Sequence, residues 1–364
     1  MRTAYSGGSQ QWDIVEYLPG GGAVRLIFFL VEGDIKPIRG FLGSSIGSRL
    51  AARVVPLYYK KFFTKNGPTE IAREAWRHAI KRAFRNIAAP FSTPFAKNFR
   101  LLAVSIYRYF LPDGHFPCGV YVFSDLERLS SEGITKAKAL SAILAESMSA
   151  VRILNDPTRT MLRYDLLRTL YDQGINDFDV YRPMQGETPR KFPVFLRNEN
   201  NHDGAISILI ENPQELAYAL REFRERGNLT SQVLIVEFSN TANENGIYAK
   251  YGAFVVGDRV FPKNINFSKN WMTKTSCLYD PELLEQEIEY VHANPHQDLL
   301  KRIFALGKID FGRIDYSMVN GNIRVWEINT NPTITNARAT RFGVRKPVYD
   351  LVEARMSSAL EELL

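Results

Sequence analysis

Two apolar segments near the C-terminus carry charged side chains, and this combination constrains the fold more than any other feature. Residues 311–319 and 323–329 have the composition of β-strands, and the Asn-Gly pair between them is typical of a tight hairpin turn. The charged residues on these strands include Arg313, Asp315 and Glu327. Because burial of an unpaired charge is costly, the fold must supply partners, a metal ion or a ligand.

These residue types suit a magnesium site. Carboxylate and amide oxygens are the hard ligands that Mg²⁺ prefers, and nucleotide phosphates with water complete the octahedron. Glu327 and Asn329 are two residues apart on one strand, so their side chains share a face. The alternative is a hairpin whose charges form salt bridges inside a core.

The turn sets a condition on that site. Strict pairing around a two-residue Asn320-Gly321 turn would place Asp315 opposite Trp326, and the carboxylates of Asp315 and Glu327 would then point to opposite faces. A three-residue loop that includes Asn322, or a β-bulge between the turn and the site, would restore a common face. We predict one of these two arrangements.

The stretch from Arg313 to Pro332 resembles the C-terminal signature of the ATP-grasp superfamily, close to D-alanine–D-alanine ligases and RimK-type carboxylate-amine ligases. In that signature an Arg-x-Asp strand and a Glu-x-Asn-x-x-Pro strand hold two magnesium ions against the phosphates of ATP. The resemblance implies that Arg313 stabilises an acyl phosphate or the tetrahedral intermediate. It also implies three ligands for Mg²⁺, or for Mn²⁺ in its place: Asp315, Glu327 and Asn329.

The resemblance extends over roughly residues 120–340 and implies further contacts with ATP. The segment 233–238 resembles the strand and hinge between the lobes, which places Glu237 and Phe238 near adenine or ribose. Two positions that usually hold phosphate-binding lysines carry Arg163 and Arg197, and arginine keeps its charge there.

The segment 198–204 occupies the place of the loop that covers the phosphates. Three further residues are candidates for phosphate or substrate contact, with an ordinary surface position as the alternative for each: His202, Lys250 and Lys263.

The pattern of the chain predicts an α+β fold in the ATP-grasp arrangement, with ATP between two α+β lobes. Strand-like segments are 119–123, 151–154, 178–182, 192–197, 233–238, 248–256, 259–267, 311–319 and 323–329, and helix-like segments are 134–145, 213–226, 281–292 and 297–306. Asp156 and Pro157 are typical of a helix start. We expect an ATP-grasp body over 116–364, with a central lobe at about 150–230 and a C-terminal lobe at about 231–340.

Residues 1–115 are expected to form a basic, partly helical domain, the counterpart of the superfamily's substrate domain. Between residues 41 and 110 there are thirteen Lys and Arg against two acidic residues. A helix predicted from Thr69 carries four of these cations at intervals of four: Arg73, Arg77, Lys81 and Arg85. This face is either solvated or the binding site of an anionic partner.

These features favour an ATP-dependent ligase that joins a small-molecule carboxylate to an amine through an acyl phosphate, and we expect its nucleotide binding to require magnesium. The alternatives are an ATP-grasp kinase that phosphorylates a small molecule and a nucleotide-binding regulatory protein. Two distant cysteines predict a cytoplasmic protein, and no apolar stretch predicts a transmembrane segment. The sequence identifies neither substrate and leaves the oligomeric state unknown.

Overall fold

The structure is a computed structural model that describes residues 12–17, 25–31, 119–129, 131–146, 151–201, 204–227, 232–274, 278, 280–332 and 343–363. The predicted basic helix near Thr69 and the candidate His202 lie outside these residues. Within the described ranges, no helix is long and apolar enough to cross a membrane. Helices and strands are mixed along the chain, which confirms the predicted α+β class.

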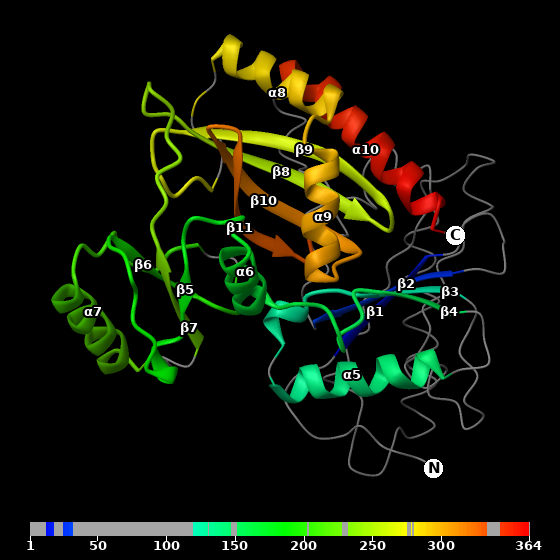
Figure 1. The fold of residues 1–364 in the computed structure, drawn as a ribbon. Helices are drawn as coiled ribbons and strands as arrows, with labels where there is room; N and C mark the ends of the chain where they lie inside the picture. Colours follow the sequence, from blue (N-terminus) through cyan, green and yellow to red (C-terminus); the bar gives the residue numbers. More distant parts are fainter. Residues whose placement is uncertain are drawn as a thin grey trace, which may run out of the picture.

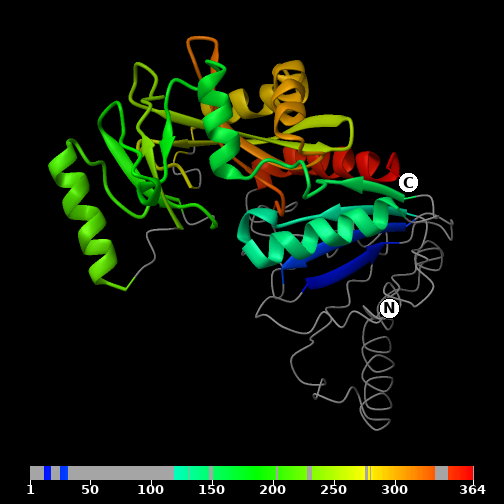
Figure 2. The ribbon, with the colours of Figure 1, turned by 60° about the horizontal axis from the view of Figure 1, so that its bottom comes forward.

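The first sheet combines strands from both sides of the predicted domain boundary. Its order is β1 (Trp12–Tyr17), β2 (Arg25–Val31), β3 (Gly119–Phe123) and β4 (Val151–Leu154). β1 and β2 are antiparallel, whereas β2, β3 and β4 are parallel. The helix α5 (Ser131–Ala145) connects β3 to β4, as a parallel pair requires, and runs along the sheet (Figure 2). The described part of residues 1–115 thus consists of two strands.

The second sheet is small and antiparallel. Its order is β5 (Val180–Tyr181), β7 (Val233–Glu237) and β6 (Val194–Asn198). The helix α7 (Pro213–Glu225) begins at Asn212, whose side chain caps it, and packs on the sheet through Leu216, Leu220 and Phe223. The helix α6 (Arg163–Asp172) lies between this sheet and the larger third sheet (Figure 1).

The third sheet is antiparallel and carries the predicted hairpin. Its order is β11 (Asn322–Asn329), β10 (Phe311–Val319), β8 (Tyr248–Val256) and β9 (Arg259–Ser268). Three helices pack against it: α8 (Pro281–Ala293), α9 (Gln297–Gly307) and α10 (Lys346–Glu361) (Figure 1). The main hydrophobic core lies between the sheet and these helices, and it extends to α6 and β7 through Leu166, Leu170 and Leu234.

Alternation along β10 separates the core face of this sheet from a polar face. The hydroxyl of Tyr316 lies 3.0 Å from the hydroxyl of Tyr290 on α8 and 2.8 Å from Nδ1 of His296 at the start of α9. Asp315, the next residue, therefore points away from the helices. We call this second face, which carries Arg313, Asp315 and Glu327, the site face.

The β10–β11 hairpin satisfies the register condition by means of a bulge. Asn320 and Gly321 form a two-residue turn with positive φ angles of 49° and 76°, and Tyr316 still pairs with Val325. The register then shifts, so that Asp315 pairs with Glu327. Trp326 is the extra residue. The predicted bulge is confirmed, and the alternative three-residue loop is wrong.

A second bulge lies at the same level of the sheet. Asp315 pairs with Gly252 of β8, and the pairing of β8 with β9 shifts directly after Gly252, so that Lys263 is an extra residue on β9. A Cβ atom on Gly252 would lie 3.0 Å from Oδ1 of Asn264. The glycine therefore leaves room for this amide beside Asp315.

One predicted element is wrong. The helix expected to start at Asp156 begins at Arg163 instead. The Asp156 carboxylate accepts hydrogen bonds from the backbone N–H of Thr158 at 3.0 Å and from the hydroxyl of Ser141 at 2.7 Å, which stabilises a turn. The hydroxyl of Thr160 then donates to the carbonyl of Lys308 at 3.0 Å. These tertiary contacts outweigh the local capping signal.

Candidate nucleotide and metal site

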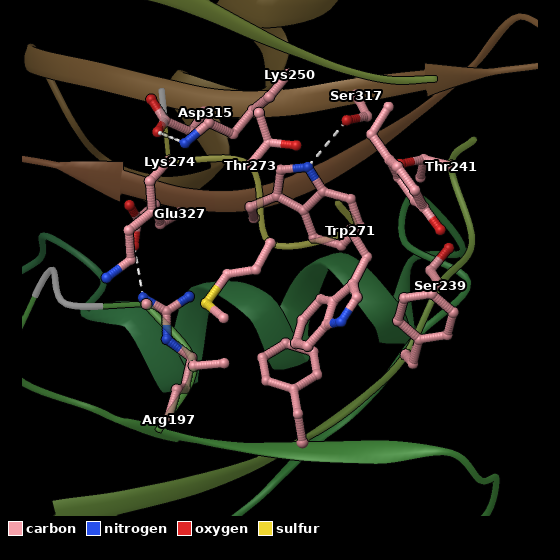
Figure 3. Close-up of a pocket in the computed structure, with 17 residues that line it drawn as sticks. Arg197, Ser239, Thr241, Lys250, Trp271, Thr273, Lys274, Asp315, Ser317 and Glu327 are labelled. Atoms are coloured by element: carbon pink, nitrogen blue, oxygen red, sulfur yellow. Dashed lines mark hydrogen bonds and ion pairs between the residues drawn. The ribbon is translucent and has the colours of Figure 1, made fainter. Parts of the chain in front are cut away.

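A pocket lies between the site face and the small sheet (Figure 3). Its polar end is lined by side chains from β6, β8, β10 and β11: Arg197, Lys250, Asp315, Ser317 and Glu327. Its other end is largely aromatic and is lined by Phe195, Phe238, Tyr248, Trp271 and Trp326. The remaining lining residues come from loops: Gly204, Ala205, Ser239, Thr241 and 272–274. The pocket thus brings together residues from both predicted lobes.

Two arginines from the other lobe bind Glu327. Its Oε2 accepts Nη2 of Arg163 at 2.9 Å and Nη2 of Arg197 at 2.6 Å. Arg163 also donates through Nη1 to the backbone carbonyls of residues 198, 199 and 201. Burial and the charge of Arg197 lower the pKa of Arg163 to about 10, so it stays protonated at neutral pH. The first turn of α6 thereby holds both the 198–201 loop and Glu327.

Asp315 is likewise held by two cations. Arg313 donates through Nε to Oδ1 at 2.7 Å and through Nη2 to Oδ2 at 3.1 Å, and Nζ of Lys250 lies 3.0 Å from Oδ2. Burial alone would raise the pKa of Asp315, but the charges of Arg313 and Lys250 hold it below its ordinary value. The carboxylate is therefore ionised at neutral pH, and both of its oxygens are paired with protein cations.

The third predicted ligand lies beside these carboxylates. Asn329 pairs with Arg313 across the hairpin, and its side-chain Oδ1 is buried without a hydrogen-bond partner. A buried acceptor without a partner is rare and fits an oxygen that awaits a cation. Across the described ranges, no three His, Cys, Asp or Glu side chains form a metal cluster by themselves. Asp315, Glu327 and Asn329 fit a magnesium ion that takes its remaining ligands from phosphate and water.

The loop after β3 fixes the end of β11, which we call the metal strand because it carries the candidate ligands Glu327 and Asn329. The residue after Asn329 is Thr330, whose backbone N–H donates to the Glu127 carboxylate at 3.0 Å and whose hydroxyl donates to its second oxygen. The backbone N–H of Leu126 donates to the same hydroxyl at 3.1 Å. Glu127 and Leu126 belong to η3 (Leu126–Arg128), directly after β3. The position of Asn329 therefore depends on the loop that follows β3.

Asp125 occupies a strained and buried position in that loop. Its backbone is left-handed, with φ 62°, and the residue is fully buried. One carboxylate oxygen lies 3.3 Å from Nη1 of Arg128, while Oδ1 has no hydrogen-bond partner. Burial, with the nearby charge of Glu127, raises the pKa of Asp125 to about 7.

The aromatic end of the pocket suits a flat apolar ring. The ring centroids of Trp271 and Phe195 are 5.0 Å apart, and those of Trp271 and Phe238 are 5.7 Å apart. Trp326, the bulged residue of β11, stacks on Phe178 at 5.1 Å, and its indole N–H donates to the hydroxyl of Ser317 at 3.1 Å. A purine base between such walls would bury its faces against aromatic carbon.

Glu237 does not line the pocket, whereas its neighbour Phe238 does. The Glu237 carboxylate accepts hydrogen bonds from the backbone N–H groups of Asp179 and Lys191, each at 3.0 Å, and from the hydroxyl of Tyr181 at 2.7 Å. These contacts tie the segment 179–191 to β7. The geometry gives Glu237 a structural task and does not favour the predicted contact of its carboxylate with adenine or ribose.

Two residues of the loop after β9, Trp271 and Lys274, line the pocket although the sequence analysis missed them. The close-up shows Lys274 over the same end of the pocket as Arg197 and Glu327 (Figure 3). A Cβ atom on Gly204 would lie 2.9 Å from Cε of Lys274. Gly204, whose φ of 86° is positive, is therefore the point at which the loop after β6 contacts the loop after β9.

Lys263 lies close to the polar end but not in the pocket lining. Its Nζ is 5.4 Å from the centroid of the Phe254 ring. Burial and the charge of Arg313 lower the pKa of Lys263 well below its ordinary value. Lys263 is the extra residue of the bulge on β9, and its predicted contact with substrate or phosphate stays a prediction.

A scan against models of known protein families finds no match, and a search of curated proteins finds none either. Solved structures show partial overlaps. A RimK-domain ATP-grasp protein from Sphaerobacter thermophilus is 16% identical, with TM-score 0.36, over 65% of this chain and 80% of that chain. A D-alanine–D-alanine ligase from Bacillus anthracis, complexed with ATP, is 14% identical, with TM-score 0.37, over 67% and 81%.

An L-amino acid ligase from Bacillus licheniformis is 10% identical, with TM-score 0.34, over 67% of this chain and 68% of that chain. The side chains of the site carry the functional argument that follows.

Proposed function

We propose that this chain is a magnesium-dependent ligase that uses ATP to activate a carboxylate and join it to an amine. One observation carries the proposal: the paired carboxylates of Asp315 and Glu327, with the unpartnered oxygen of Asn329, face a group of cations supplied by both lobes. Such a group neutralises a triphosphate, and the adjacent aromatic end accepts its base.

Each side chain has a task in this proposal. Arg163, Arg197 and Lys274 hold the phosphates, and Phe238 and Trp271 bury the base. Asp315, Glu327 and Asn329 hold magnesium, which neutralises charge that develops on the transferring phosphoryl group. Arg313 lies on the same face and stabilises the acyl phosphate or the tetrahedral intermediate.

The reaction needs no nucleophile from the protein. An oxygen of the substrate carboxylate attacks the γ-phosphorus of ATP, and the bond from that phosphorus to the bridging oxygen breaks, which releases ADP. The amine nitrogen then attacks the acyl carbon, loses a proton and expels phosphate. The cationic side chains of the site form no covalent bond to a reactant. Their role is to orient the reactants and to balance the charge that develops.

The test has two stages. A thermal-shift assay with Mg²⁺ and AMP-PNP should raise the melting temperature, because a ligand that binds only the folded state stabilises it by mass action. Amino acids, dipeptides and other small carboxylates are then screened for ADP release. An amide product with free phosphate supports the ligase. A phosphoester without free phosphate would replace it by the kinase, and the absence of nucleotide binding would remove both.

A further inference from the structure

Both candidate metal-binding carboxylates are paired with protein cations. Glu327 binds Arg163 and Arg197, and Asp315 binds Arg313 and Lys250. The four cations and two carboxylates together carry a net charge of +2. Lys274 adds a further cation to the same pocket. A divalent metal ion that arrives alone therefore meets a site that is already positive, whereas an oligophosphate meets an attractive one.

Two of these cations are placed to change partner. Arg163 is fixed by three backbone carbonyls, and Arg313 binds Asp315 through two nitrogens. Arg197, by contrast, makes its side-chain hydrogen bond to Glu327 through Nη2, and its side chain donates to no backbone carbonyl of the described residues. Its buried Nε has no hydrogen-bond partner. A buried guanidinium with an unused donor loses free energy that an added phosphate oxygen would restore. Lys250 reaches Asp315 through its single flexible ammonium.

We infer that the metal-free site is a receptor for an oligophosphate anion and excludes a free divalent cation until phosphate arrives. Phosphate oxygens draw Arg197 and Lys250 off Glu327 and Asp315, and the released carboxylates then bind the metal. This reverses the expectation from the sequence that nucleotide binding requires magnesium. The inference rests on the proposed function, because it assigns an order of binding to the same site.

Two binding measurements on the full chain test this order. The first is calorimetric titration with inorganic tripolyphosphate in buffer that contains EDTA, in which binding should be measurable without metal. The second is titration of the metal-stripped protein with Mn²⁺, followed by the EPR signal of the free ion, without any phosphate. The affinity for Mn²⁺ alone should be at least about tenfold weaker than in the variants below, or about 1.4 kcal/mol.

Arg197→Gln and Lys250→Gln each remove one of the cations that change partner. Each should weaken tripolyphosphate binding by about tenfold or more and strengthen Mn²⁺ binding by a similar factor. Damage to the fold would weaken both, so the opposite signs identify the exchange. Arg168→Gln is the matched control. Arg168 lies on α6 and binds Asp179 away from the pocket, so this variant should change neither affinity.

The outcomes separate the inference from the proposed function. If wild-type protein binds Mn²⁺ alone as tightly as Arg197→Gln and Lys250→Gln do, or needs a metal to bind tripolyphosphate, the inference is wrong. Binding of AMP-PNP with Mg²⁺ in the same samples would leave the proposed function in place. If AMP-PNP with Mg²⁺ also fails to bind, the proposed function falls together with the inference.

Discussion

At the scale of single residues, Glu327 connects the predicted metal site with the observed ion pairs. It faces Asp315 across the hairpin and accepts two arginine side chains. We expect Glu327→Gln to lower ATP consumption roughly a hundredfold or more, because it removes the charge that binds the metal. It should also lower the free energy of unfolding by up to about 3 kcal/mol without nucleotide, since two buried arginines lose their anion.

ATP consumption and urea denaturation measure these two effects. Glu222→Gln is the control, because Glu222 pairs with Arg226 on the exposed side of α7. Exposed pairs contribute little to stability, so this variant should match wild type in both assays. Near-normal turnover by Glu327→Gln would remove the metal-ligand assignment.

Asp125 gives a prediction about pH. Its pKa is raised to about 7 in the folded protein and returns to its ordinary value near 4 on unfolding. The folded state therefore binds the proton more tightly, and the stability gained from this is present below pH 4 and lost as pH rises to 7. Asp125→Asn does not titrate. The stability of this variant relative to wild type should increase between pH 4 and 7 and stay constant above 7.

Urea denaturation at several pH values measures this difference. The gap should reach a few kcal/mol above pH 7, because each pKa unit corresponds to about 1.4 kcal/mol. Asp258→Asn, at an exposed hairpin turn, serves as the control. A gap that does not change with pH would show that the Asp125 carboxyl is ionised throughout.

The sequence points to the candidate ligand residues but not to what surrounds them. Asp315, Glu327 and Asn329 are predicted from the resemblance of one short stretch, whose residue types suit a magnesium site. The contacts of Glu327 with Arg163 and Arg197 span 164 and 130 residues of the chain, so no local pattern contains them. Lys274 was missed because a loop lysine has no periodicity to distinguish it. The resemblance places Glu237 near the nucleotide, whereas in the structure its carboxylate accepts hydrogen bonds from backbone N–H groups and from the hydroxyl of Tyr181.

At the scale of elements, the bulge at Trp326 brings Glu327 opposite Asp315. Deletion of Trp326 removes the extra residue and makes the ladder regular, with Val325 still opposite Tyr316 and Glu327 still opposite Asp315, so the candidate ligands keep their face. We expect this deletion variant to retain binding of tripolyphosphate but to bind AMP-PNP with Mg²⁺ at least about tenfold more weakly, because Trp326 lines the aromatic end of the pocket. Trp326→Phe retains the bulge and an aromatic ring on Phe178, and it should retain binding of both ligands. Loss of tripolyphosphate binding by the deletion variant would contradict this register.

Most strands of the structure could be predicted, because their alternation and turn signals are local. The Asn-Gly turn and the segments 248–256 and 311–319 have the expected bounds. The start of α6 could not be predicted, since the turn before it is stabilised by Ser141 and Lys308 from distant segments. The choice between bulge and loop needed the structure, because both satisfy the same pairing of carboxylates.

At the scale of the whole molecule, the first sheet and the metal strand are joined by the Glu127–Thr330 contact. Thr330→Val removes the hydroxyl that donates to the Glu127 carboxylate and accepts from Leu126 N–H. We expect a loss of about 1–3 kcal/mol in the free energy of unfolding, as for a buried hydrogen bond to a charged group. Magnesium-dependent turnover should also fall, because Asn329 precedes Thr330.

Urea denaturation and the magnesium dependence of turnover measure these effects. Thr135→Val is the control, since the Thr135 hydroxyl bonds only within α5 and is exposed. A stable Thr330→Val protein with unchanged magnesium dependence would show that the first sheet does not position the metal strand.

The two bulges of the third sheet have a consequence for its shape. At the level where Asp315 pairs with Gly252, the marginal strands β9 and β11 each contain one residue more than the inner strands β8 and β10. One residue of strand corresponds to about 3.3 Å of length. Both margins are therefore longer than the middle at this level, and a flat ladder cannot accommodate the difference. The sheet therefore curves at the level of Asp315, and the extra length of the two outer strands shapes the floor of the pocket.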